Sequence, residues 1–274
     1  MRFNCKVKER VSPHLWGVCH RHYRSIAFER NPLRGILHRS FLLFIIILSP
    51  LTIYAQRTRG IDVSKFQGNI NWTKVAKDST IQFVYVRATE GTTIQDAYYK
   101  TNISKAKKAG LLVGSYHVYS SKTTAYQQMA NMRKMIKKKE QDLAPVLDIE
   151  GHHSGRLYMQ RVDKLLELME QEYGVKPVIY TSEKVYKVHF SGKKYAKYHI
   201  FIANYRKYPT TRFTLWQYTE SGHCPGISGE VDFIRIHRDH SLSDIKMPKP
   251  KPKPKEETSK EEAKKEEATK EADK

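Results

Sequence analysis

Cysteine is scarce in this chain, with three among 274 residues. Cys5 and Cys19 lie near the amino terminus, which leaves Cys224 alone in the remainder. A single cysteine cannot form a disulfide within residues 20–274, and Cys224 lacks the neighbouring cysteines of a zinc knuckle. The histidines around it are scattered instead of spaced as ligands. We therefore expect an ordinary hydrophobic core, no metal and no cofactor.

Long apolar runs are also missing. The longest, residues 41–55, has about 15 residues and contains Pro50, whereas a membrane-spanning helix needs about 20. A secretory signal cleaved after Ala55 fits this length better than a permanent span. Because the basic leader is long for a signal, either translation starts near Arg34 or the segment is an uncleaved membrane anchor. Both alternatives export residues 56 onward, to the periplasm, the cell envelope or the medium.

Acidic residues are few relative to basic ones, 28 against 49, so the formal net charge is +21. A basic exported domain suits an anionic target such as a cell-wall polymer or a membrane surface. Nucleic acid is the rival explanation, but we find no zinc-finger spacing, no RNP-like aromatic motif and no clear helix-turn-helix. Residues 244–274 are predicted to be a disordered tail rich in Lys, Pro and Glu. The sequence leaves the oligomeric state open.

The middle of the chain alternates between short apolar strands and amphipathic segments. Strands are predicted at GIDVSKF, QFVYVRA, LLVGSYHVY, APVLDIE, KPVIYT, HIFIANY, FTLWQYT and VDFIRIH. Helices are predicted at Asp96–Ala109, Thr123–Lys139 and Leu157–Tyr173. The later connections are too short for full helices. Residues 56–243 are therefore predicted to form a TIM-like parallel β/α barrel with an incomplete helical ring, of the (β/α)5(β)3 type.

Two acids end the fourth predicted strand, APVLDIE. Residues i and i+2 of a strand point to the same face, so Asp148 and Glu150 project side by side, with backbones roughly 7 Å apart. Like charges this close raise one pKa, which keeps one carboxyl protonated as a general acid while the other is ionised. An acidic strand end running into a loop is the plain alternative, so the pair needs support from elsewhere.

That support comes from the other strand ends, because active sites of such barrels lie at the carboxyl ends of the strands. Asp62 lies in the first predicted strand and Asp232 begins the last. Polar or aromatic residues occupy the other strand ends: Arg87, Glu90, Tyr116, Tyr180, Asn204, Trp216 and Gln217. Carboxylates surrounded by aromatic rings, with no metal or nucleotide motif, describe a carbohydrate site.

The segments GIDVSKFQG, FVYVRATEG, AGLLVGSYHVY, PVLDIE, PVIYT, LWQYT and VDF resemble glycoside hydrolase family 25, the muramidase type of lysozyme, in order and spacing. The resemblance implies cleavage of the β-1,4 bond between N-acetylmuramic acid and N-acetylglucosamine in peptidoglycan. It implies that Glu150 is the general acid and Asp148 its assisting partner, and that Asp62 and Asp232 shape the site. Tyr116, Tyr180, Asn204, Trp216, Gln217, Arg87 and Glu90 are the implied substrate contacts.

Three other hypotheses stay open from the sequence. The barrel could be a non-catalytic wall-binding module, although binding alone does not require four acids. It could be a glycosidase of another N-acetylhexosamine glycan, such as a chitin-like or host polymer. The weakest is a basic polymer-binding protein.

Overall fold

The structure is a computed structural model that describes residues 58–151 and 155–248. The basic leader, the apolar segment 41–55 and the chain beyond residue 248 lie outside these ranges, so the expectations for them stay predictions. Within the described ranges, no helix combines the length and the apolar character needed to cross a membrane.

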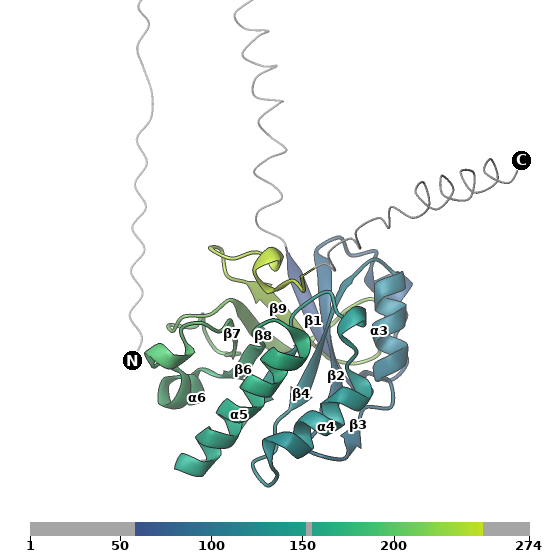
Figure 1. Cartoon of the computed structure of the whole chain (residues 1–274). Helices are drawn as coiled ribbons and strands as arrows, with labels where there is room; N and C mark the ends of the chain where they lie inside the picture. The colour runs from purple at the N-terminus through teal and green to yellow at the C-terminus, as the bar shows by residue number, and fades with distance from the viewer. Residues whose placement is uncertain (1–57, 152–154, 249–274) are drawn as a thin grey trace, which may run out of the picture. The chain divides into compact units, whose positions relative to one another are not determined.

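Eight strands form a closed barrel, and a short ninth strand extends one of them (Figure 1). The strands are β1 Arg59–Val63, β2 Ile81–Glu90, β3 Ile94–Gln95, β4 Leu112–Val118, β5 Val146–Ile149, β6 Val178–Ser182, β7 Ile200–Ala203, β8 Leu215–Gly222 and β9 Val231–Ile236. The order around the barrel is β1, β9, β8, β7, β6, β5, β4, β2, and pairing of β2 with β1 closes it. All eight predicted strands are present, and the predicted barrel is confirmed.

The last barrel strand runs against its neighbours. β9 pairs antiparallel with β8 and β1, whereas the other barrel strands pair in parallel. The connection from Gly222 to Val231 is too short for the crossover of about a dozen residues that a parallel return needs. The start of β9 therefore lies at the barrel end where the other strands finish. The prediction of a parallel barrel is wrong for this strand, and its reversal brings Asp232 to the mouth.

Three full helices cover the outer face of the first strands (Figure 1): α3 Tyr99–Lys108, α4 Ala125–Met135 and α5 Arg156–Tyr173. Shorter turns are η2 Lys65–Gln67, α2 Trp72–Val75, η3 Lys138–Glu140, α6 Glu183–Val185, η4 Tyr186–Phe190, η5 Lys193–Tyr195 and η6 Leu242–Ile245. The described connections between β7, β8 and β9 contain no helix. The helical ring is therefore incomplete, as predicted.

Two helices are shorter than the sequence pattern predicts. α3 begins at Tyr99 and not at Asp96, because the Asp96 carboxylate accepts a hydrogen bond from the Tyr98 N–H (2.9 Å) and forms the preceding turn. α4 ends before Ile136 and not at Lys139, because the Ile136 backbone is extended, with φ −85° and ψ 108°. Both limits are set by local backbone conformation at the helix ends, which hydrophobic spacing does not report.

Apolar side chains pack in two layers. The inner layer fills the barrel with Phe83, Tyr85, Val146, Val178, Phe201, Leu215 and Ile234. The outer layer lies between strands and helices and takes Met129, Met132 and Leu165 from α4 and α5, as predicted. Tyr126 is different, because its side chain is 63% exposed and the inward position of that turn belongs to Ala125.

The described chain closes the barrel floor as it ends. Ile245 of η6 is buried and packs with Leu143 and Ala144 in the inner layer. Its carbonyl accepts a hydrogen bond from the Ala144 N–H (2.7 Å). The barrel floor therefore includes residues up to Ile245, whereas the sequence predicts a domain end at residue 243.

Candidate active site

Four carboxylates meet at the barrel mouth. Asp62 comes from β1, Asp148 from β5, Glu150 from the residue after β5, and Asp232 from β9. All four line one pocket of about 380 Å³, together with Tyr85, Tyr116, Val146, Tyr180, Phe201 and Gln217. Parallel β1 and β5 end at this mouth, and antiparallel β9 begins there. The side-by-side projection of Asp148 and Glu150 predicted from the sequence agrees with their shared pocket.

Asp62 and Asp232 form a close pair. They are register partners on antiparallel β1 and β9, and both accept a hydrogen bond from Gln217 Nε2, at 2.8 and 3.0 Å. Burial, with the charge of Asp232 next to it, raises the pKa of Asp62 well above its usual range. Burial also raises the pKa of Asp232 to about 6. Two carboxyls this close hold one proton between them, which limits the negative charge at the mouth.

Gln217 connects this pair to two tyrosines. Its Oε1 accepts hydrogen bonds from the hydroxyls of Tyr180 (2.7 Å) and Tyr205 (2.8 Å), while its Nε2 donates to the two aspartates. The amide has two N–H donors and two acceptor lone pairs, so these four bonds use its whole capacity. Gln217 lines the pocket and fixes the positions of other groups that face it, and its role as a sugar contact stays a prediction.

We expect Gln217→Glu to lower the predicted glycosidase activity by roughly 10- to 100-fold, because the change removes both N–H donors and adds a third carboxylate beside Asp62 and Asp232. The added charge raises the pKa of Asp232, so the acidic limb of the pH profile should move to higher pH. Gln82→Glu, an exposed change on β2, is the matched control. A pH profile unchanged in Gln217→Glu would exclude this positioning role.

Asp148 is the most isolated acid of the site. It is 6% exposed, and its Oδ1 is buried with no hydrogen-bond partner among the described residues. Burial is the main cause that raises its pKa well above the usual range, Glu150 and Glu90 add to it, and the charge of Arg87 opposes it. Glu150, in contrast, is exposed. A buried carboxyl with an unused oxygen at a pocket wall has room to bind a substrate N–H or O–H.

The outer part of the mouth is lined by charged and aromatic side chains. Arg87 and Glu90 form an ion pair. Both line the outer pocket, as do Tyr116 and all four acids, and there they meet Phe66 of η2. Phe66 is 75% exposed. Neither Phe66 nor Tyr205 is among the site residues predicted from the sequence, although the aromatic residue that ends the first predicted strand segment, GIDVSKF, was a usable signal.

Two predicted sugar contacts lie elsewhere. On β8, Leu215 and Gln217 face the barrel interior, so Trp216 between them faces outward. Its indole N–H donates to the Asn204 carbonyl (2.8 Å). The Asn204 side chain donates to Glu183 (2.6 Å) and holds the loop after β7. Neither Trp216 nor Asn204 lines the pocket that contains the acids. The structure thus places both outside the pocket of the acids, and their role as sugar contacts stays a prediction.

Metal ligands would need at least three close His, Cys, Asp or Glu side chains in a suitable arrangement. Within residues 58–151 and 155–248 no such group is present. Asp62 and Asp232 instead accept hydrogen bonds from the Gln217 amide, and Asp148 and Glu150 line the open pocket.

Comparison with known proteins gives a consistent result. Residues 61–227 match the family model of glycosyl hydrolases family 25. The uncharacterized protein YegX of Escherichia coli K12 is 34% identical over 184 residues, which is 64% of this chain and 67% of YegX. Lysozyme M1 of Streptomyces globisporus is 31% identical over 197 residues, 64% of this chain and 66% of that protein.

Solved structures agree. A family 25 glycosyl hydrolase from Bacillus anthracis superposes with a TM-score of 0.61 at 25% identity, covering 67% of this chain and 93% of that one. The lysozyme of Streptomyces coelicolor gives 0.61 at 27% identity, covering 69% and 94%. With its barrel, its four acids at the mouth and a family match over most of the barrel, the chain belongs to glycosyl hydrolase family 25 and is a glycoside hydrolase of the lysozyme type.

Proposed function

We propose that this protein is an exported N-acetylmuramidase that cleaves the β-1,4 bond between N-acetylmuramic acid and N-acetylglucosamine in peptidoglycan. The observation that carries the proposal is the paired carboxyls of Asp148 and Glu150 in one pocket, one buried with a free oxygen and the other exposed. Glycoside hydrolysis needs such a pair. Similarity to lysozyme M1 and to an autolytic lysozyme of Clostridium acetobutylicum supports the peptidoglycan substrate.

Glu150 is the proposed general acid, because it reaches the open pocket where a glycosidic oxygen would lie. Before substrate binds, burial keeps a proton on Asp148. When a glycan is bound, we propose that the proton held by Asp148 passes to Glu150, which faces the glycosidic oxygen. Glu150 then protonates the leaving oxygen, and Asp148, ionised beside Arg87, stabilises the positive charge that develops on the sugar ring.

Asp62 and Asp232 are proposed to shape the site and not to transfer the proton. Gln217 holds both, so they form a fixed wall facing the Asp148 and Glu150 side of the pocket. Tyr116 and Tyr180 line the same pocket and offer ring edges and hydroxyls to sugar. Arg87 and Glu90 flank the outer part of the mouth. Water completes the reaction by adding its hydroxyl to the anomeric carbon and returning a proton to the acid.

Export and domain limits belong to the same proposal. We place the leader and its signal or anchor at residues 1–55, the catalytic barrel from residue 56, and the Lys/Pro/Glu tail after the barrel floor. The apolar run 41–55 and the peptidoglycan substrate both support export. Cell fractionation that found the intact chain in the cytoplasm alone would contradict it.

Mass spectrometry of the products released from defined peptidoglycan tests the reaction directly. We expect fragments with N-acetylmuramic acid at the reducing end, because the cleaved bond follows that sugar. Reducing ends on N-acetylglucosamine would indicate a glycosidase of different bond specificity. Binding without release of any fragment would instead indicate a wall-binding module.

A further inference from the structure

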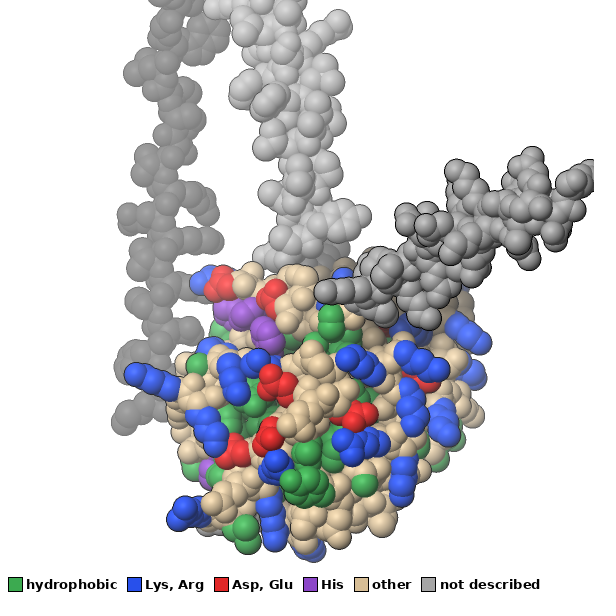
Figure 2. Space-filling view, viewed as in Figure 1, with side chains coloured by type: hydrophobic (Ala, Val, Ile, Leu, Met, Phe, Trp, Pro, Cys, Tyr) green, Lys and Arg blue, Asp and Glu red, His purple; other side chains and the backbone are tan. Residues whose placement is uncertain are grey.

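Positive charge is segregated on one side of the barrel. From residue 97 to residue 139 the sequence contains no Asp or Glu. The same stretch contains Lys100, Lys105, Lys107, Lys108, Lys122, Arg133, Lys134, Lys137, Lys138 and Lys139. Figure 2 shows Lys and Arg side chains crowding the side of the molecule that α3 occupies in Figure 1, with few acids among them.

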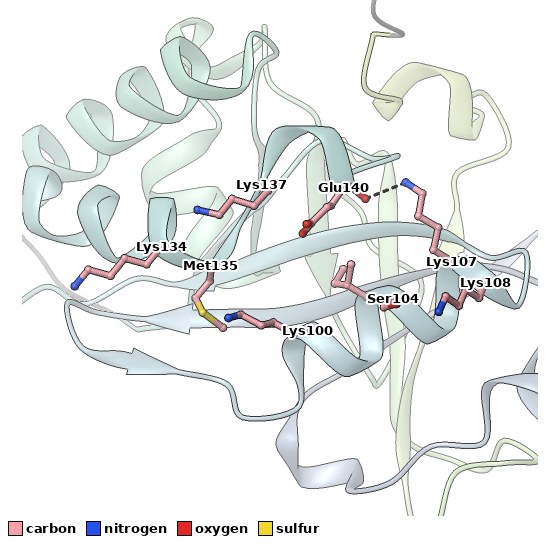
Figure 3. A pocket seen from close by; sticks show the side chains of 9 residues that line it. Lys100, Ser104, Lys107, Lys108, Lys134, Met135, Lys137 and Glu140 are labelled. Atoms are coloured by element: carbon pink, nitrogen blue, oxygen red, sulfur yellow. Dashed lines mark hydrogen bonds between the residues drawn. The ribbon is translucent and has the colours of Figure 1, made fainter.

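Several of these lysines border a groove, seen in Figure 3, between α3 and the end of α4 with η3. Its volume is about 1010 Å³. The charged lining comes from Lys100, Lys107, Lys108, Lys134 and Lys137, with Glu140 as the single acid. Ile103 and Met135 form a buried apolar floor. The groove shares no lining residue with the pocket of the four acids.

Two of the lysines are already engaged with the protein. Lys107 pairs with Asp142 (2.8 Å) and donates to the Glu140 carbonyl, the contact drawn in Figure 3. Lys137 donates to the Arg133 carbonyl (2.6 Å). Lys100, Lys108 and Lys134 have no hydrogen bond or ion pair to another described residue, and all three are exposed. These three exposed ammonium groups border one hollow in which Glu140 is the single carboxylate, so a polyanion lying there would gain an attraction from each of them.

We propose that this groove binds a linear phosphate polymer, independently of the hydrolase activity. Lysine ammonium groups are compact point charges that bind phosphate without a fixed pairing geometry, so exposed lysines along one groove suit a chain of repeated phosphates. No aromatic ring lines it either, so nucleic-acid bases find nothing on which to stack. Its apolar residues are sunken, so it has no side chain to insert into a lipid layer.

The test measures binding of a fluorescently labelled inorganic polyphosphate to the full chain by polarisation. The groove variant is Lys100→Glu/Lys108→Glu/Lys134→Glu. The matched control, Lys184→Glu/Lys193→Glu/Lys197→Glu, makes the same charge change at exposed lysines on α6 and η5 and beside them. Basic residues outside the described ranges are identical in both variants, so the difference between the variants isolates the groove.

We expect the groove variant to bind polyphosphate at least about 10-fold more weakly than wild type, and the control to stay within about 2-fold. The salt dependence of binding should become shallower by roughly two to three in log–log slope for the groove variant. Release of fragments from peptidoglycan free of phosphate polymer should match wild type in both variants, which shows that they are folded. If the reversal variant is unfolded, the Lys→Gln triple at the same positions replaces it.

Equal losses in the two variants would overturn the proposal, because binding would then follow net charge alone. It would also be overturned if polyglutamate, single-stranded DNA or phosphatidylglycerol vesicles bound more tightly than polyphosphate with the same dependence on the three groove lysines.

Discussion

Glu150→Gln is expected to reduce the release of muropeptides by about 10³-fold or more, since it removes the only proton donor assigned to the leaving oxygen. Glutamine keeps the size of the side chain but cannot supply the proton. Because Glu150 is exposed, the melting temperature should stay close to that of wild type. Product release, measured by mass spectrometry, and thermal unfolding of the same preparation separate loss of catalysis from loss of structure.

The control for this variant is Glu167→Gln, which removes one carboxylate from the exposed face of α5. It should retain wild-type activity, so a general effect of charge is excluded. Wild-type release by Glu150→Gln would refute the assignment of the general acid and direct attention to Asp148 or Asp62 as the donor.

Asp148→Asn is expected to have two opposite effects. Activity should fall by roughly 10²- to 10³-fold, because the variant loses both the stored proton and the charge that supports the sugar cation. Stability at pH 8 should rise. Burial raises the pKa of Asp148 in the folded state, so its stabilising contribution is complete below the unfolded pKa and is lost as the pH rises through the folded value. Asparagine does not ionise and avoids that loss.

Thermal unfolding at pH 4.5 and pH 8 tests the sign of this effect. The gain in melting temperature of Asp148→Asn over wild type should be larger at pH 8. Asp78→Asn serves as a control of opposite sign: burial alone would raise the pKa of Asp78, but hydrogen bonds from Thr80 and the charge of Arg59 lower it. Asp78→Asn should therefore lower the melting temperature at pH 8. If Asp148→Asn also lowered the melting temperature at pH 8, the conclusion that Asp148 is buried and protonated would be contradicted.

Local patterns were sufficient to predict the strands and the acids. A side chain at the end of a parallel barrel strand reaches the mouth whatever the rest of the chain does, so Asp62, Asp148 and Glu150 could be placed from strand ends alone. Asp232 begins its strand, and its position depends on the reversal of β9, which follows from loop length and tertiary pairing.

Which face of a strand points into the barrel was harder to predict than where the strand lies in the sequence. In Leu215, Trp216 and Gln217, alternation puts the outer two residues on one face, but it does not say which face is inside. The aromatic ring of Trp216 suggested a sugar contact, yet Leu215 points into the apolar barrel interior with Ile234, and Gln217 follows to the same side. Sequence alone also could not show that the Gln217 amide would be saturated by Tyr180, Tyr205 and two aspartates.

The closed floor of the barrel lies at the end opposite the mouth. Thr58, which precedes β1, lines one surface depression together with Leu242 and Lys246. The described chain thus enters and leaves at the pole opposite Asp148 and Glu150. A support coupled directly at residue 58 or residue 248 would therefore lie against the sealed pole, and the pole with the acids would face away from it.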